Sequence, residues 1–248
     1  MRTALIALLL VFVILAVAPP ASTQESRPDP ARPVPRFEAD VTQVPDLQPW
    51  GHAAEALCQV WYPRIVSLLQ SDDSARPLPS VVKIVFENEM RGIAYASGGE
   101  IHIASAWVRS HPNDFGMVVH ELTHLVQRYP RSRGAGWLVE GIADYVRLKH
   151  FEPLVTVPRI DFTKAKHTDS YKTTAAFLSW LESKYGADLV PKLNAALRVG
   201  RYADTLFKNL TGKELGQLWS DFAAAQPVAE RGAAYNPLAP CVEEGTDR

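Results

Sequence analysis

The segment at residues 118–126 constrains the fold more than any other part of the chain, because it places His-Glu-x-x-His inside an apolar run. His120 and His124 are four residues apart, so on an α-helix they project from the same side, about one turn from each other. Apolar side chains occupy most of the other positions and would cover most of the helix surface. Such a helix is buried, and its polar groups need partners inside the protein.

Metal binding explains these polar groups best. Two neutral imidazoles one turn apart can take two corners of a tetrahedral zinc site. Glu121 is rotated by about 100° from His120 around the helix axis, so it need not bind the metal and can accept a proton from water as a general base. The pattern is short and also occurs by chance, in which case both histidines would be core residues bonded to backbone carbonyls. The apolar context favours the zinc site.

A third ligand must come from another segment, since catalytic zinc usually keeps three protein ligands and one water. The turn-rich residues 130–136 can reverse the chain before a predicted helix at 137–148. Glu140 on this helix is the best candidate, and Asp144 on the same face could orient a ligating histidine through its free ring N–H. The spacing also permits the reverse, with Asp144 as the ligand and Glu140 as its support. Gly141 lacks a side chain, which would let the two helices approach closely.

Several motifs resemble those of known metallopeptidases. The sequence WLVEGIA at residues 137–143 resembles the W-x-x-E-G-x-A segment of gluzincin metallopeptidases, in which the Glu is a zinc ligand. Four further segments, taken together, are similar to the basic secretory protein family, a peptidase family of plants and bacteria. These segments are HELTHLVQ at 120–127, LVEGIADYVRL at 138–148, YKTTAAF at 171–177 and LWSDF at 218–222. The resemblance extends from about residue 84 to about residue 224.

The resemblance implies a zincin-like fold, export from the cell and metallopeptidase activity on peptide or protein substrates. By position, it implies His120, His124 and Glu140 as zinc ligands and Glu121 as the general base. We therefore expect an exported zinc-dependent peptidase. The alternative is a catalytically silent zinc-containing protein that binds cell-wall or extracellular polymer. An intact Glu121 argues against that alternative, because a purely structural site needs no base.

A tyrosine is expected to complete the catalytic group. Tyr171 lies just before a predicted helix at 173–184. Its phenol could donate a hydrogen bond to the oxyanion of a tetrahedral intermediate, a role that tyrosine or histidine has in gluzincins. Tyr145, one residue past Asp144, is the alternative.

The secondary-structure pattern indicates an α+β fold of zincin-like type, with a small mixed sheet beside the His-Glu-x-x-His helix and a mainly helical C-terminal half. Short β-branched runs predict strands at 81–86, 93–96 and 101–104, of which the last two form a hairpin. The edge strand of such a sheet can pair with an extended peptide, although the sequence does not say which strand that is. His102 alternates with two isoleucines and is expected to point outward rather than to bind metal.

Apolar periodicity predicts the helices. The first is kinked or restarted at Pro63, and Asn113 or Asp114 can cap the His-Glu-x-x-His helix. Thr211 and Glu214 form a capping-box pattern for the last helix. The predicted helices span residues 53–69, 113–128, 137–148, 173–184, 189–197, 205–210 and 213–224.

Length and charge exclude several classes of protein. A chain of 248 residues, 47% of them hydrophobic, can bury a full core, and we expect a single domain at residues 37–226. A formal net charge of −1 gives no electrostatic footprint for nucleic acid or for an anionic membrane surface. We expect a monomer whose partner is a peptide or protein substrate.

The N-terminus predicts export. Arg2 precedes an uncharged apolar run at residues 4–18 that is short for a membrane span. Residues 1–22 are therefore a signal peptide, or an uncleaved anchor because prolines lie near the cleavage points, and the protein is secreted or periplasmic. A Pro-rich linker at 23–36 follows, and 227–248 form a C-terminal tail. Cys58 and Cys241 are either one disulfide or two free thiols; the sequence favours neither.

Overall fold

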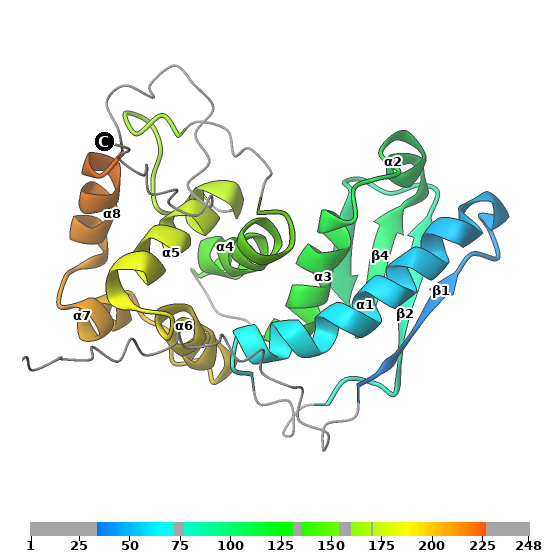
Figure 1. Cartoon of the computed structure of the whole chain (residues 1–248), viewed down its shortest axis with the longest axis horizontal. Coiled ribbons are helices and arrows are strands. Elements are labelled where there is room, and N and C mark those ends of the chain that lie inside the picture. The colour runs from blue at the N-terminus through cyan, green and yellow to red at the C-terminus, as the bar shows by residue number, and fades with distance from the viewer. Residues whose placement is uncertain (1–33, 72–76, 131–134, 154–159, 170, 227–248) are drawn as a thin grey trace, which may run out of the picture.

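The fold combines a small sheet with a mainly helical second half, as the sequence predicts. A computed structural model describes residues 34–71, 77–130, 135–153, 160–169 and 171–226. The sheet and helices α1 to α3 occupy one end of the molecule, and α4 to α8 occupy the other (Figure 1). The predicted signal or anchor, the C-terminal tail and Cys241 lie outside the described residues, so neither alternative for Cys58 and Cys241 is tested.

Four strands form one mixed sheet in the order β1-β2-β4-β3. Strands β1, β2 and β4 run parallel to one another. Strand β3 forms an antiparallel hairpin with β4 and is an edge strand, because it is the last in this order. The hairpin turns at Gly98 and Gly99, whose φ angles of 62° and 87° suit residues without a β-carbon. The strands are β1 (Arg36–Asp40), β2 (Val81–Glu87), β3 (Ala94–Ser97) and β4 (Glu100–Ala104).

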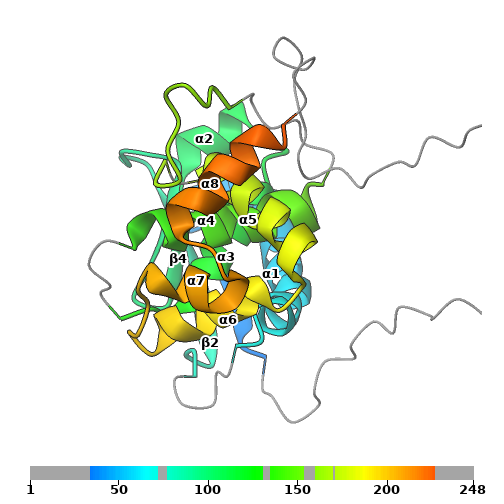
Figure 2. The same ribbon diagram turned by 90° about the vertical axis from the view of Figure 1, so that its left-hand side faces the viewer.

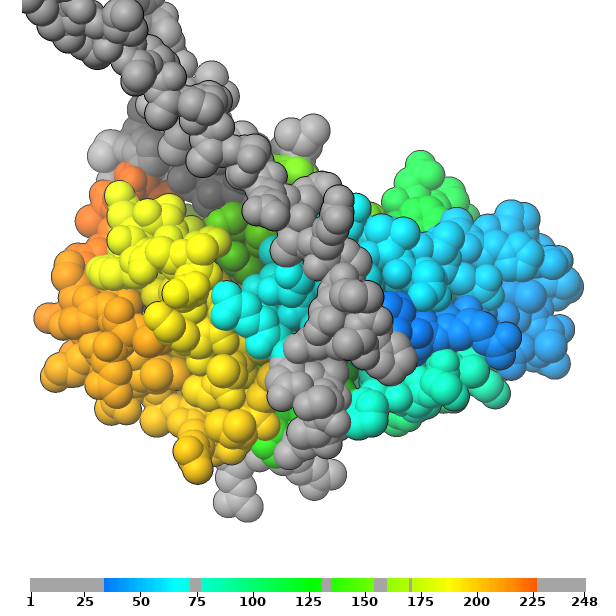
Figure 3. All heavy atoms as spheres, turned by 60° about the horizontal axis from the view of Figure 1, so that its bottom comes forward, coloured from blue at the N-terminus to red at the C-terminus, as the bar shows by residue number. Residues whose placement is uncertain are grey.

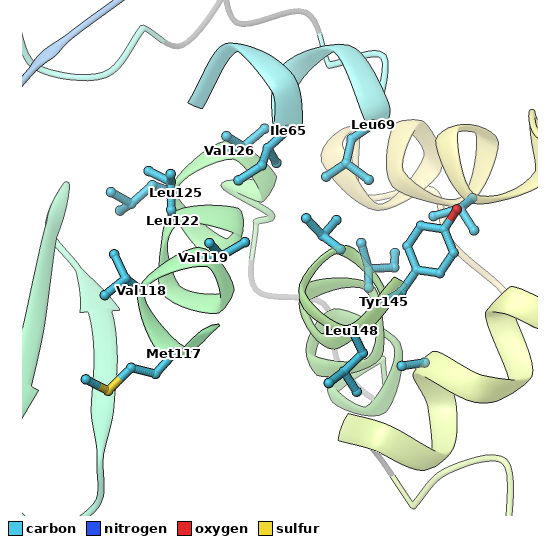
Figure 4. Packing of buried hydrophobic residues seen from close by; sticks show 14 of the residues in the cluster. Ile65, Leu69, Met117, Val118, Val119, Leu122, Leu125, Val126, Tyr145 and Leu148 are labelled. Atoms are coloured by element: carbon cyan, nitrogen blue, oxygen red, sulfur yellow. The ribbon is translucent and has the colours of Figure 1, made fainter. Parts of the chain in front are cut away.

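Two helices pack against the sheet. Helix α1 (Gln48–Leu68) contacts β1, and α3 (Gly116–Gln127) contacts β3, β4 and α1. Alternate strand residues such as Val82, Ile84, Ile101 and Ile103 are fully buried. Figure 4 shows Met117 and Val118 of α3 pointing toward a strand, while Val119 points the other way, toward the helices that follow. Helix α3 is therefore buried between the two halves of the protein.

Helix α1 continues through Pro63, so of the two predicted alternatives, a kink or a restart at the proline, the restart is wrong. The helix also begins five residues earlier than the apolar pattern suggests, at Gln48. Cys58 lies on its inner face and is fully buried. At the C-terminal end of α1, Ile65 and Leu69 point toward the space between α3 and the helices that bear Tyr145 and Leu148 (Figure 4). Helix α1 thus contributes to the core of both halves.

The second half begins with α4, which continues into a π-helical turn, η2. A β-carbon at Gly141 of α4 would overlap the side chain of Thr174, so this glycine permits close packing of α4 against α5 rather than against α3. Figures 2 and 3 show α6, α7 and α8 at the end of the molecule away from the sheet. The elements are α4 (Gly136–Tyr145), η2 (Val146–Phe151), α5 (Tyr171–Tyr185), α6 (Leu189–Arg198), α7 (Thr205–Thr211) and α8 (Leu215–Ala224).

Some local expectations need correction. The N-cap of α3 is Phe115, not Asn113 or Asp114, although an Asp114 oxygen lies 3.4 Å from the amide nitrogen of Met117. The capping box of α8 pairs Glu214 with Gln217, because Thr211 belongs to the end of α7. Strand β1, the short 3-10 helix η1 (Pro45–Leu47) and helix α2 (Ser105–Ser110) were not predicted. Among the described residues, no helix is both long and apolar enough to cross a bilayer.

Candidate metal centre

Three of the predicted ligands converge at the contact between α3 and α4. The Nε2 atoms of His120 and His124 lie 3.1 Å apart, as expected for histidines one turn apart on a helix. An Oε2 atom of Glu140 lies 3.3 Å from the first nitrogen and 3.4 Å from the second. Within the described part of the chain, this is the one group of three such side chains whose ligand atoms all lie within 4.8 Å of one another.

The other nitrogen of each imidazole is bonded away from the centre. His120 Nδ1 lies 2.7 Å from an Asp144 oxygen, and His124 Nδ1 lies 2.6 Å from the side-chain oxygen of Gln127. With each Nδ1–H donated outward, both Nε2 lone pairs can face the point where Glu140 also points. Two imidazole nitrogens and one carboxylate oxygen are a donor set that suits zinc with an open coordination position. The residues present therefore fit the metal.

At the metal-free centre, the ionisation of His120 on α3 and that of Glu140 on α4 depend on each other. Burial opposes the charged form of His120, but hydrogen bonds to Asp144 and Glu140 outweigh it and raise the pKa of His120 to about 9. Burial also acts against ionised Glu140, but hydrogen bonds from the two histidines outweigh it and lower the pKa of Glu140 to about 2. A carboxylate that is ionised at neutral pH is ready to bind a cation.

Glu121 lies beside the centre but is not one of its three converging groups. It is only 7% exposed, although it is an acidic residue. Burial is the largest cause of its raised pKa; the charges of His120 and His124 act in the opposite direction, and the charge of Glu140 adds to the increase. A carboxylate whose pKa is raised is a better proton acceptor than an exposed one.

Of the two tyrosines considered, Tyr171 faces the centre. It begins α5 with a left-handed φ of 51°, and its ring lies 6.1 Å from the ring of His120, nearly parallel to it. The charge of Glu140 is the largest cause of a raised pKa for Tyr171, so its phenol keeps its proton and can donate a hydrogen bond. Tyr145 is instead 4% exposed and packs against His150.

A cleft of about 1120 Å³ contains these groups. Edge strand β3 lines one side, through residues that include Ala94 and Ala96. At the end of the cleft near the start of α3 lies Arg147, which donates to Glu152 at 2.8 Å and to Asp114 at 2.9 Å. The cleft thus combines an open sheet edge with a polar, charged floor.

His102 lies away from the centre, on the sheet face opposite Ile101 and Ile103, as its alternation predicts. The sequence interpretation assigned no role to Gln127, which contacts His124. The available signal was its position, three residues after His124 on an otherwise apolar helix, where an amide needs a partner. Arg147 was likewise given no functional role, although it follows Asp144 by three residues on the same helical face.

The fold and the site define a class of protein: a mixed α+β chain with a His-His-Glu group of metal-binding type in an open cleft. A family model described as BSP, peptidase of plants and bacteria, matches residues 51–222, so the chain belongs to this peptidase family. The resemblance to the basic secretory protein family is thereby confirmed. No curated protein and no solved structure matches the chain.

Proposed function

We propose that this protein is an exported, zinc-dependent peptidase with a zincin-like catalytic domain. His120, His124 and Glu140 bind the zinc ion, Glu121 is the general base, Tyr171 stabilises the oxyanion and Asp144 orients His120. The observation that carries the proposal is the convergence of three ligand atoms from two helices beside a buried carboxylate. Membership of a peptidase family supports peptide or protein substrates.

Each side chain has a separate part in hydrolysis. A zinc ion held by the three ligands would supply a Lewis acid for the scissile carbonyl and lower the pKa of a water molecule toward about 7. Glu121 accepts the proton of the attacking water and then transfers it to the nitrogen of the leaving amine. The Tyr171 phenol donates a hydrogen bond to the oxygen on which negative charge develops.

The sheet edge gives the substrate a place to bind. Strand β3 pairs with β4 on one side only, and Ile93 at its start also bonds to β4 through Ala104. In an antiparallel pair, every second residue of an edge strand directs its backbone groups away from the sheet. An extended peptide can therefore pair with β3 across the cleft from α3, with its scissile bond beside His120 and Glu121.

Export, the monomeric state, the absence of a nucleic-acid partner and the absence of membrane contact beyond a possible N-terminal anchor belong to the proposal on sequence grounds alone. The signal or anchor at residues 1–22 carries the export proposal. The near-neutral formal charge of −1 supports the lack of a nucleic-acid partner.

The test compares the purified wild-type protein with Glu121→Gln, a change that keeps the size of the side chain and removes the base. We expect one zinc ion per chain in both proteins, by elemental analysis. Cleavage of a quenched fluorescent peptide mixture should fall by roughly 10²–10⁴-fold in the variant. Cleavage by Glu121→Gln at the wild-type rate would contradict the base assignment. Zinc in both and cleavage in neither would favour the catalytically silent polymer-binding protein.

A further inference from the structure

We propose that Gln127 is a positioning residue of the metal centre: it holds His124 in the ligand orientation and ties the backbone of the Glu140 helix to the same point. The inference rests on the proposed metal site, but it concerns residues beyond its ligands. Gln127 is the last residue of α3 and is only 1% exposed. A buried amide of this kind needs all of its hydrogen-bonding groups satisfied.

The hydrogen bonds of Gln127 determine which of its atoms faces which partner. Its nitrogen lies 2.9 Å from the carbonyl oxygen of Val139, which can only accept. The amide oxygen must therefore face His124, whose Nδ1 lies 2.6 Å away. An amide oxygen can only accept, so the proton of His124 is on Nδ1. This tautomer leaves Nε2 of His124 as a lone pair directed at His120 and Glu140.

The contact with Val139 extends this effect to the second helix. Val139 immediately precedes the ligand Glu140 on α4. One side chain thus bridges a ligand on α3 and the backbone beside a ligand on α4. The end of α3 that carries Gln127 is itself held from α6, because Arg198 donates to the backbone oxygens of Val126 and Gln127. Two helices of the second half, α4 and α6, therefore hold the end of α3 that carries Gln127.

The chemical difference between the partners of the two histidines also has a reason. Asp144 supplies a carboxylate to His120, whereas Gln127 supplies a neutral amide to His124. Glu121, Glu140 and Asp144 already bring up to three negative charges to a largely buried centre. An amide accepts the imidazole proton without adding a fourth charge, whose burial would be costly. It also provides the N–H that Val139 requires, which a carboxylate cannot.

The experiment measures metal binding by the purified protein, with Zn²⁺ in competition against a chromophoric chelator and with Co²⁺ followed by its visible absorption. The variants are Gln127→Met, which removes the hydrogen bonds to His124 and Val139 at similar size, and Gln127→Glu, which restores an acceptor for His124 but not the donor to Val139. Val190→Ala is the matched control. Val190 is fully buried on α6 and does not line the cleft, so its truncation lowers stability without changing a residue of the centre.

We expect Gln127→Met to weaken zinc binding by roughly 10–100-fold and to alter the Co²⁺ spectrum, as loss of a group that orients a ligand does. Gln127→Glu should recover part of the affinity, and Val190→Ala should keep the wild-type affinity and spectrum. In the metal-free protein, ¹⁵N spectra should assign the Nδ1–H tautomer to His124 in wild type and a mixture in Gln127→Met.

Three results separate failure of this inference from failure of the metal site. Stoichiometric zinc in wild type, with the same affinity and Co²⁺ spectrum in Gln127→Met, would overturn the role of Gln127 and leave the site intact. Equal losses in Gln127→Met and Val190→Ala would also overturn it, because the effect would then follow stability alone. If the folded wild-type protein binds neither metal, the site itself is wrong.

Discussion

Two groups of histidine and carboxylate side chains lie within this protein, and their chemistry is alike at first sight. At the centre between α3 and α4, His120 Nδ1 lies 2.7 Å from Asp144. On the opposite face of the sheet, His102 Nδ1 lies 2.8 Å from Glu87. The difference is in the second nitrogen. His102 Nε2 faces Glu100 at 3.5 Å, while Nε2 of His120 faces a second histidine and a carboxylate together.

Secondary structure is the cause of this difference. A strand sends alternate side chains to opposite faces, so His102 stands alone among carboxylates and against the ring of Tyr95. A helix returns to the same face after one turn, so His124 joins His120 there. The facing helix then adds Glu140 and Asp144, also one turn apart. A histidine–carboxylate pair alone therefore does not make a metal-binding group, which here requires the side chains of two helices in contact.

The largest expected effect separates the two groups directly. His124→Ala should lose stoichiometric zinc and peptide cleavage, because it removes one of three ligands. His102→Ala should keep both, since its nitrogens face only the partly buried carboxylates of Glu87 and Glu100 on the far side of the sheet. Zinc per chain measured by elemental analysis, with cleavage on the same samples, provides the test. Loss of zinc in both variants would remove the distinction between the groups.

A smaller effect is expected from the carboxylates that support the histidines. Asp144→Asn keeps the shape of the side chain but weakens the hydrogen bond to His120, so zinc affinity should fall by roughly 10–100-fold. Glu87→Gln is the equivalent change beside His102 and should leave zinc affinity unchanged. Competition with a chelator measures both. Unchanged affinity in Asp144→Asn would mean that the carboxylate does not orient its histidine.

Packing behind the centre should have a more modest effect. In Gly141→Ala the new methyl group overlaps Thr174, which lies one turn after Tyr171 on α5. We expect a stability loss of about 1–3 kcal/mol and a several-fold decrease in cleavage, because α5 must move and carries Tyr171 with it. Thermal unfolding and cleavage rates measure these effects. A β-carbon at position 141 would lie 2.1 Å from Cγ2 and 2.5 Å from Cβ of Thr174. The double variant with Thr174→Ala removes the nearer of these two atoms and should recover part of both losses, whereas no recovery would contradict the packing explanation.

Another histidine, His150, sharpens the comparison because no carboxylate of the described residues forms an ion pair with it. Within the described residues, Nε2 of His150 is buried without a hydrogen-bond partner. Burial, together with the charge of Lys149, lowers the pKa of His150 to about 4 from its ordinary 6.5. The unfolded chain therefore binds this proton more tightly, and the stability that His150 provides in its neutral form is present above pH 6.5 and lost as the pH falls toward 4.

This pH dependence has an upper limit of about 3 kcal/mol. Urea unfolding of the metal-free protein at several pH values between neutral and weakly acidic should show a shallower loss of stability in His150→Leu than in wild type. Titration of the metal-site residues is common to both proteins and does not affect the difference between them. Parallel curves would mean that His150 is not held in its neutral form.

Particular elements explain how much the sequence could predict. Helix α3 was placed closely because its apolar positions and histidine spacing are local properties of the chain. The convergence of Glu140 on the histidine pair was also anticipated, since a reversing turn and a second apolar helix leave few arrangements. Strand β1 was missed because only Phe37 within it is strongly buried, and its pairing partner β2 lies far along the sequence.

Other features depend on tertiary contacts that no local pattern specifies. Gly141 was expected to let α3 and α4 pack closely, but the helix that packs closely against it is α5. The role of Gln127 depends on the carbonyl of Val139, whose position follows from the packing of two helices. The left-handed start of α5 at Tyr171 is likewise set by surrounding structure, because a tyrosine does not favour that conformation on its own.

X-ray absorption by the zinc-loaded protein tests the central claim most directly, because it observes the ligands themselves. We predict one zinc ion per chain, bound by nitrogen and oxygen at roughly 2.0–2.1 Å with scattering from two imidazoles. In His124→Ala, any zinc that remains should show one imidazole fewer. Substoichiometric zinc in the folded wild-type protein, a sulfur ligand, or two imidazoles persisting in His124→Ala would contradict the assignment of His120, His124 and Glu140 as the metal centre.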